Sequence, residues 1–85
     1  MFYVYVLRSL RNKKRYVGFT SKDPQVRLRE HNSGGNNWTR QNAPHELVHQ
    51  ESFQDEQEAR RREKFLKSGQ GRKRLDETLL SYIPR

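Results

Sequence analysis

Two short runs of aromatic and β-branched residues, "FYVYVL" and "RYVGFT", open the chain and are separated by the polar segment "RSLRNKK". Such runs are typical of strands, and Asn12 favours a turn between them, so the pattern predicts a β-hairpin. The sequence does not fix the register of this hairpin. One register places Tyr5 opposite Tyr16, so that both phenols share one face of the sheet. The other face, directed toward a core, then carries Val4, Val6 and Val17.

The next segment, "SKDPQVRLREHNSGG", predicts a short helix over residues 24–32. Asp23 suits the N-cap and Pro24 the first helical position, and two glycines follow the last turn. The segment "NNWTRQNAP" that comes next has the composition of a loop. After it, "HELVHQESF" alternates in polarity as a third strand does.

Two helices are predicted for the rest of the chain. The first runs from about residue 55 to 68, with Asp55 as N-cap, Glu58 in the position of a capping box, and Gly69 at its end. We interpret "KSGQGRKR" as a helix cap and turn. A final helix is expected within "QGRKRLDETLLSYI", ended by Pro84, and its buried side would carry Leu75, Leu79, Leu80 and Ile83.

The predicted order of elements is therefore ββαβαα. It indicates an α+β fold in which a small three-stranded antiparallel sheet is flanked by helices, in one domain over residues 1–85. With 85 residues the chain has room for one modest core. Hydrophobic residues make up 31% and charged residues 33%, but the apolar residues cluster into periodic segments, so we expect a folded chain.

The composition excludes several kinds of site. The chain has no cysteine, so it can form neither a disulfide nor a cysteine-based zinc site, and its three histidines lack the spacing of metal ligands. No apolar stretch approaches the roughly 20 residues that span a bilayer. The first residues are also too short a run for a signal peptide. We therefore expect no membrane contact and a cytoplasmic location.

The net charge of +8 is unevenly distributed along the chain. Residues 1–45 carry nine Lys or Arg and two acids, residues 46–59 carry five acids and no Lys or Arg, and residues 60–85 carry nine Lys or Arg and three acids. Basic segments attract a polyanion, and nucleic acid fits best, because Lys and Arg release its counterions. A solvated basic surface without a partner is the alternative. Nonspecific phosphate contacts are expected from Arg72, Lys73 and Arg74.

Glu63 lies on the inward stripe of its predicted helix, together with Ala59 and Leu66. A carboxylate that points inward must be paired or must bind a cation, because burying it bare is costly. Glu63 is therefore either one partner of a partly buried salt bridge to an arginine or a cation ligand.

Arg27 and His31 are four residues apart on a predicted helix and so share a face. Together they could form an anion site, in which arginine presents a planar fork to phosphate and histidine offers a hydrogen bond or a proton. They could equally be two solvated side chains. In the predicted loop, Trp38 either plugs the edge of the core or stacks on a base, and with Arg40 it is a candidate nucleic-acid contact.

Four blocks of the sequence resemble, in order and separation, the signature motifs of the GIY-YIG endonuclease family: "YVY" at residues 3–5, "YVG" at 16–18, "RLREHN" at 27–32 and "EARRREKFLKSG" at 58–69. The resemblance covers about residues 2–75 and is closest to the small single-domain members. The first motif is Tyr-Val-Tyr where the family has Gly-Ile-Tyr. Phe19 follows Gly18 where some repair members carry a lysine.

The resemblance implies a metal-dependent endonuclease that hydrolyses DNA phosphodiester bonds, in repair or recombination by family association. Tyr5 and Tyr16 match the tyrosines of the first two motifs, and Arg27 matches the catalytic arginine. His31 matches the His/Tyr position four residues later, and Glu63 matches the glutamate that binds one divalent ion. Glu63 would then hold Mg²⁺ or Mn²⁺ largely through water, and Arg27 would neutralise charge growing on the phosphate. Tyr16, with Tyr5 beside it, would orient or deprotonate the attacking water.

Two other interpretations remain open at this point. The chain could be a basic nucleic-acid-binding module that keeps the fold without cleaving, or a structural protein that would not require Glu63 and Arg27 at these positions. Occupation of all five family positions favours the enzyme. Specificity, if the enzyme has any, is expected to come from the shape of the DNA, from a partner protein or from self-association.

Overall fold

A computed structural model describes residues 1–80, apart from the side chain of Leu80. Its elements, in chain order, are β1 (Phe2–Ser9), β2 (Arg15–Thr20), α1 (Pro24–Asn32), α2 (Asn37–Gln41), β3 (His45–Phe53), α3 (Glu56–Lys67) and α4 (Gly69–Leu80). The predicted positions of Ile83 and Pro84 lie outside the described residues, as does the side chain of Leu80.

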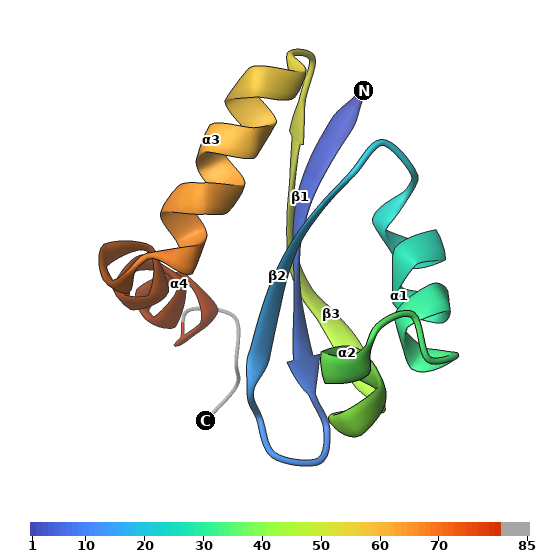
Figure 1. Ribbon diagram of the computed structural model, residues 1–85. Helices are drawn as coiled ribbons and strands as arrows, with labels where there is room; N and C mark the ends of the chain where they lie inside the picture. Colours follow the sequence, from blue (N-terminus) through green and yellow to red (C-terminus); the bar gives the residue numbers. More distant parts are fainter. Residues whose placement is uncertain (81–85) are drawn as a thin grey trace.

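The three strands form one antiparallel sheet in the order β2-β1-β3, which confirms the predicted α+β class. The sheet separates two layers of helices (Figure 1): α1 and α2 cover one face, while α3 and α4 cover the other. Strand β1 is central, so its side chains are buried on both faces. Strand β2 is an edge, and the candidate motif "YVG" lies on it.

The hairpin does not have the register in which Tyr5 is opposite Tyr16. Tyr5 pairs with Gly18, and Tyr16 pairs with Leu7, two pairs further along the ladder. The five-residue connection between the strands sets this register, because Ser9 donates a backbone hydrogen bond to Lys14 at 2.8 Å. Since Tyr5 and Leu7 are two residues apart on β1, the two phenols still share a face, as expected.

The main apolar core lies between the sheet and the α3–α4 layer. Alternation directs three valines of the hairpin to this face, as the sequence predicted, and the helices supply an alanine and two leucines. The buried cluster consists of Val4, Val6, Val17, Ala59, Leu66 and Leu75. Leu79 is also buried, as predicted for α4. The opposite face of β1 instead buries Tyr5 and Leu7, beside a buried histidine on α1.

Two local predictions were wrong. The segment predicted as a loop contains the short helix α2, because the Asn36 side chain accepts the backbone N–H of Thr39 and Thr39 completes a capping box. The segment predicted as a cap and turn is the first part of α4, and α3 ends at Lys67 with Ser68, not Gly69, as its C-cap.

Helix α4 can begin directly against the last turn of α3 because Gly71 has no side chain. A Cβ at this position would lie 1.9 Å from the carbonyl oxygen of Phe65 and 2.5 Å from the Cα of Leu66. Both neighbours are backbone atoms, so they cannot move aside without displacing α3 or α4. A Cβ at Gly69, in the same turn, would meet nothing within 4 Å.

This contrast predicts opposite effects of two matched substitutions. Gly71→Ala should lower the free energy of unfolding by about 3 kcal/mol, because overpacking against backbone forces the helices apart. Gly69→Ala should leave it unchanged or raise it by about 0.5 kcal/mol, because alanine restricts the unfolded chain. Urea denaturation of both variants is the measurement. Equal effects would show that α3 and α4 do not depend on this close approach.

Candidate active site

Tyr5 is the buried centre of the polar face of the sheet. It lies on the central strand with no exposed surface. A Cβ on Gly18, its partner on β2, would lie 2.4 Å from Cζ and 2.5 Å from the hydroxyl oxygen of Tyr5. The phenol therefore lies directly over the backbone of β2, in space that any other residue at position 18 would fill.

The hydroxyl of Tyr5 meets His31 of α1, which is 1% exposed. The oxygen lies 2.8 Å from Nε2 of His31. Arg27, one helical turn earlier on α1, places a guanidinium nitrogen 3.4 Å from the same Nε2. The predicted Arg27–His31 pair is therefore a part-buried cluster with Tyr5, and it is not a pair of solvated side chains.

Helix α2 closes this cluster from the other side. The hydroxyl of Thr39, which is fully buried, lies 3.2 Å from Nδ1 of His31. The Asn36 amide donates to the Tyr16 hydroxyl at 3.5 Å. Neither residue was a sequence-based candidate, because the segment was taken for a loop. The signal that could have found them is the spacing of Asn36 and Thr39, which suits an N-cap and its N3 partner.

Tyr16 lies at the partly exposed side of the cluster. Its ring centroid is 5.0 Å from that of His31 and 6.4 Å from that of Tyr5. Trp38 of α2 packs on Tyr16 at 5.7 Å and on His45 at 5.8 Å. Trp38 is thus part of an aromatic stack that supports Tyr16, and it remains only partly buried.

The electrostatics of the cluster keep both central groups neutral. Burial raises the pKa of Tyr5, while a hydrogen bond and the charge of Arg27 lower it and the charges of Tyr16 and Glu63 raise it. Burial lowers the pKa of His31, and the positive charge of Arg27 lowers it further. The resting site therefore contains a protonated phenol and a neutral imidazole beside a guanidinium.

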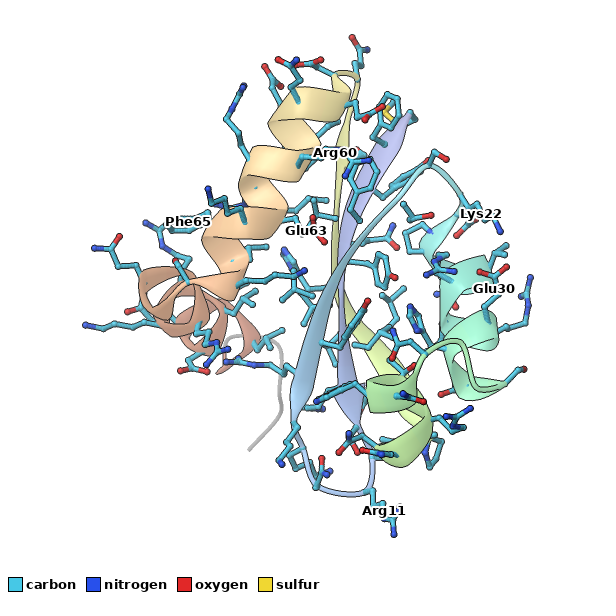
Figure 2. The ribbon with its side chains drawn as sticks, in the orientation of Figure 1. Arg11, Lys22, Glu30, Arg60, Glu63 and Phe65 are labelled. Carbon is cyan, nitrogen blue, oxygen red and sulfur yellow. The ribbon has the colours of Figure 1, made fainter. Side chains whose placement is uncertain are left out.

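Glu63 approaches from the opposite layer. It projects from α3 toward β2 (Figure 2), and its side chain is 20% exposed. Its ion-pair partner is Lys67, at 3.1 Å, and not an arginine. Its charge is close enough to raise the pKa of Tyr5. Among residues 1–80 no group of three or more His, Cys, Asp or Glu side chains could hold a metal ion.

A groove runs from Tyr16 and Trp38 along the edge of β2 to α4. Its lining includes four apolar residues, Val17, Leu66, Leu75 and Leu79, and one acid, Asp76. Six basic residues line it: Arg8, Lys13, Lys14, Arg15, Lys67 and Arg72.

Only some of the candidate phosphate contacts line this groove. Arg72 lines it, whereas Lys73 and Arg74 are exposed positions of α4 that are not among its lining residues. Arg40 is exposed on α2, where it donates to the side chain of Asn37. Of the predicted nucleic-acid contacts, the structure thus brings only Trp38 and Arg72 to the groove that adjoins Tyr16.

The sequence matches the GIY-YIG catalytic domain over residues 1–76. The chain belongs to the GIY-YIG family. This membership supports a nuclease-type function and, with it, binding of DNA. A solution structure of the UPF0213 protein BH0048 from Bacillus halodurans is 33% identical to this chain, with a TM-score of 0.54, and the match covers 92% of this chain and 85% of that one. No curated protein matches.

Tyr5 of the first GIY-YIG motif and Gly18 of the second motif are paired across the two strands and pack directly on each other. Gly18 is required by the phenol that crosses it, and that phenol reaches the histidine of the third motif. In residues 1–80 no helix is both long enough and apolar enough to cross a membrane.

The buried histidines predict a loss of stability on mild acidification. The pKa values of His31 and His45 are lowered in the folded state, chiefly by burial. The unfolded chain therefore binds more protons below about pH 6.5, and stability present above that pH is lost as the pH falls. Each histidine should remove up to about 1.4 kcal/mol per pH unit within this window.

Urea denaturation at pH 7.5 and 5.5 measures the total effect, and NMR titration of the ring protons assigns it to each histidine. The pKa values of the carboxylates Glu30 and Glu51 are lowered, so these groups change the unfolding free energy only at more acidic pH. They do not contribute to the difference between pH 7.5 and 5.5. An unfolding free energy that stays constant over this range would contradict neutral, buried histidines.

Proposed function

We propose that this protein is a metal-dependent endonuclease that hydrolyses phosphodiester bonds in DNA. One observation carries the proposal: side chains from three separate motifs, Tyr5, Tyr16, Arg27 and His31, converge beside a basic groove. Neither a structural salt bridge nor an apolar core requires two phenols, an imidazole and a guanidinium to lie in contact with one another. Such a set can bind a phosphate, hold a water molecule and move a proton.

Arg27 is the group that meets the phosphate. Its guanidinium has only donors, and it is part-buried between His31 and Glu30, so a phosphate oxygen could replace Glu30 as its partner. Glu30 also pairs with Lys22 at 3.0 Å and so would keep a cation when Arg27 turns to the substrate. Charge that grows on the phosphate oxygens would then be balanced at a fixed position.

The two phenols have different positions and hence different roles. Tyr5 is fully buried and bonded to His31, so it holds the imidazole and Arg27 in place. Tyr16 is only partly buried and lines the groove, so it is the phenol that a water molecule beside a bound phosphate can reach. We assign both the orientation and the activation of the attacking water to Tyr16, whose ring packs against the neutral His31.

Glu63 fits one kind of divalent-ion site. Mg²⁺ commonly binds through one or two carboxylates, substrate phosphate and several waters, and does not require a cage of protein ligands. Glu63 offers one partly exposed carboxylate near the phenols, and its partner Lys67 is 53% exposed and free to turn away. When bound there, Mg²⁺ or Mn²⁺ would supply positive charge at the scissile phosphate and stabilise the leaving 3′ oxygen.

The proposal predicts that Glu63→Gln abolishes cleavage and preserves binding to DNA. The substitution removes the charge that would hold the ion and keeps the shape of the side chain. Cleavage of labelled DNA duplexes, branched DNA and single strands is measured with Mg²⁺, Mn²⁺ or EDTA, and binding by fluorescence anisotropy. Glu56→Gln on the same helix is the matched control, because the ion pair that Glu56 makes within residues 1–80 is with exposed Arg60.

A thermal melt with and without Mn²⁺ separates the ligand from the salt bridge. If Glu63 holds the ion, Mn²⁺ should stabilise the parent and Glu56→Gln but not Glu63→Gln. Metal-induced stabilisation that survives in Glu63→Gln would refute the assignment. Binding of DNA without cleavage under any metal condition would support the non-catalytic module.

The groove predicts which cations bind DNA. Replacing Lys14 and Arg72, which are exposed and line the groove, by alanine should weaken binding and reduce the slope of log K against log salt by about 0.9 for each phosphate that is no longer neutralised. Replacing Arg61 and Lys64, exposed on α3 outside the groove, should change the slope much less. Equal reductions from both pairs would indicate a diffuse basic surface.

A further inference from the structure

The polar residues of α2 form a directed chain of hydrogen bonds that ends at the candidate active site. Its first link is fixed by the backbone: Oδ1 of Asn36 accepts the N–H of Thr39 at 2.8 Å, which sets the orientation of the Asn36 amide. The Thr39 hydroxyl has one proton to donate, and its oxygen lies 3.0 Å from the same Oδ1 and 3.3 Å from the backbone carbonyl oxygen of Asn36. With that proton on Asn36, Oγ1 of Thr39 is an acceptor toward its other neighbours.

Those neighbours are two nitrogen atoms. The backbone N–H of Asn36 donates to Oγ1 of Thr39 at 3.2 Å. Nδ1 of His31 lies 3.2 Å from Oγ1 on the other side. Oγ1 has two lone pairs, so it can accept from both nitrogens. This arrangement requires the proton of the neutral imidazole to be on Nδ1.

Arg27 favours the same tautomer through a longer contact. A guanidinium can only donate, and it lies 3.4 Å from Nε2 of His31. A proton on Nε2 would point toward the Arg27 donor, whereas a lone pair there accepts the Tyr5 hydroxyl at 2.8 Å and is attracted to the nearby guanidinium. Thr39 at Nδ1 and, more weakly, Arg27 at Nε2 thus favour the same tautomer from opposite sides of the ring.

From this geometry we infer that Thr39 is a positioning residue, which fixes His31 as the Nδ1–H tautomer so that Nε2 aligns the Tyr5 hydroxyl and the Arg27 guanidinium. Thr39 lies too deep to touch a substrate, since it has no exposed surface. Any effect of Thr39 on the reacting groups would therefore pass through His31. The inference rests on the proposed function for its consequence in catalysis, but the tautomer itself is a property of the free protein.

The direct test is ¹⁵N NMR of the imidazole in the free protein at pH 7.5. The parent should show a protonated Nδ1 and an unprotonated Nε2. Thr39→Val removes the hydroxyl at nearly constant volume and should shift His31 toward the Nε2–H form, whereas Thr39→Ser should keep the parent tautomer. A parent with Nε2–H, or a Val variant with an unchanged tautomer, would overturn the inference.

A control separates positioning from helix capping, because Thr39 also belongs to the capping box of α2. Asn36→Ala removes the side chain that caps α2 but leaves the Thr39 hydroxyl beside His31, and it leaves the backbone carbonyl of position 36, 3.3 Å from that hydroxyl, to accept its proton. It should destabilise α2 by about 1 kcal/mol, as the removal of a cap does, while His31 stays Nδ1–H. If Asn36→Ala and Thr39→Val change the tautomer equally, Thr39 acts only through the fold.

Where cleavage is observed, Thr39→Val should lower kcat roughly 10- to 100-fold with little change in KM, the scale expected when an orienting partner is removed, and Thr39→Ser should restore most of it. A Val variant that changes the tautomer yet cleaves at the parent rate would overturn the catalytic part of the inference. If the parent itself cleaves no DNA, the proposed function fails, while the NMR result still decides the role of Thr39.

Discussion

The passage of the Tyr5 phenol over Gly18 is the constraint on which the rest of the candidate site depends. The aromatic ring occupies the space of a side chain on β2, so its hydroxyl reaches across the sheet to His31, 26 positions later in the chain. Burial of the ring removes water from this contact, which strengthens the hydrogen bond and keeps the phenol protonated. Any Cβ at position 18 would move the hydroxyl away and leave a buried imidazole nitrogen without its closest partner.

This constraint explains why the two faces of the sheet differ in character. The face toward α3 and α4 is filled by Val4, Val6 and Val17 with helix residues, and it supplies most of the apolar burial. The face toward α1 and α2 buries polar groups, and most of them are partnered: His31 by Tyr5 and Thr39, and Ser9 by the carbonyl of Asn42 at 2.6 Å. The exception is Nε2 of His45, which has no hydrogen-bond partner within residues 1–80. A small domain can bury such groups only when another layer provides its stability.

Much of this arrangement could be predicted from the sequence, and the exceptions have physical reasons. Strong local signals, such as Asp23 and Pro24 at a helix start and the alternation of residues 45–53, predicted elements with the bounds found. The hairpin register was not predictable, because alternation is unchanged by a shift of two residues and only the length of the turn decides it. Family resemblance, and not periodicity, singled out Tyr5, Tyr16, Arg27 and His31 as one site. Thr39 escaped both approaches, because a five-residue helix has little periodicity and the role of its hydroxyl exists only once α2 packs on α1.

The position of the cluster at an edge strand has a consequence for chemistry. Tyr5, on the central strand, and His31, against it, are held rigidly by packing, whereas Tyr16 lies on edge strand β2, where one side is open to the groove. Glu63 belongs to the opposite helical layer and projects toward the same edge strand (Figure 2). A site made from both layers can therefore meet only at the edge of the sheet, since a central strand would separate them. The edge of the sheet therefore combines rigidly held side chains with access to solvent. Attack on a phosphodiester requires both, because a water molecule, the basic groove that binds the polyanion and the rigid hydrogen-bond donors must meet at one place.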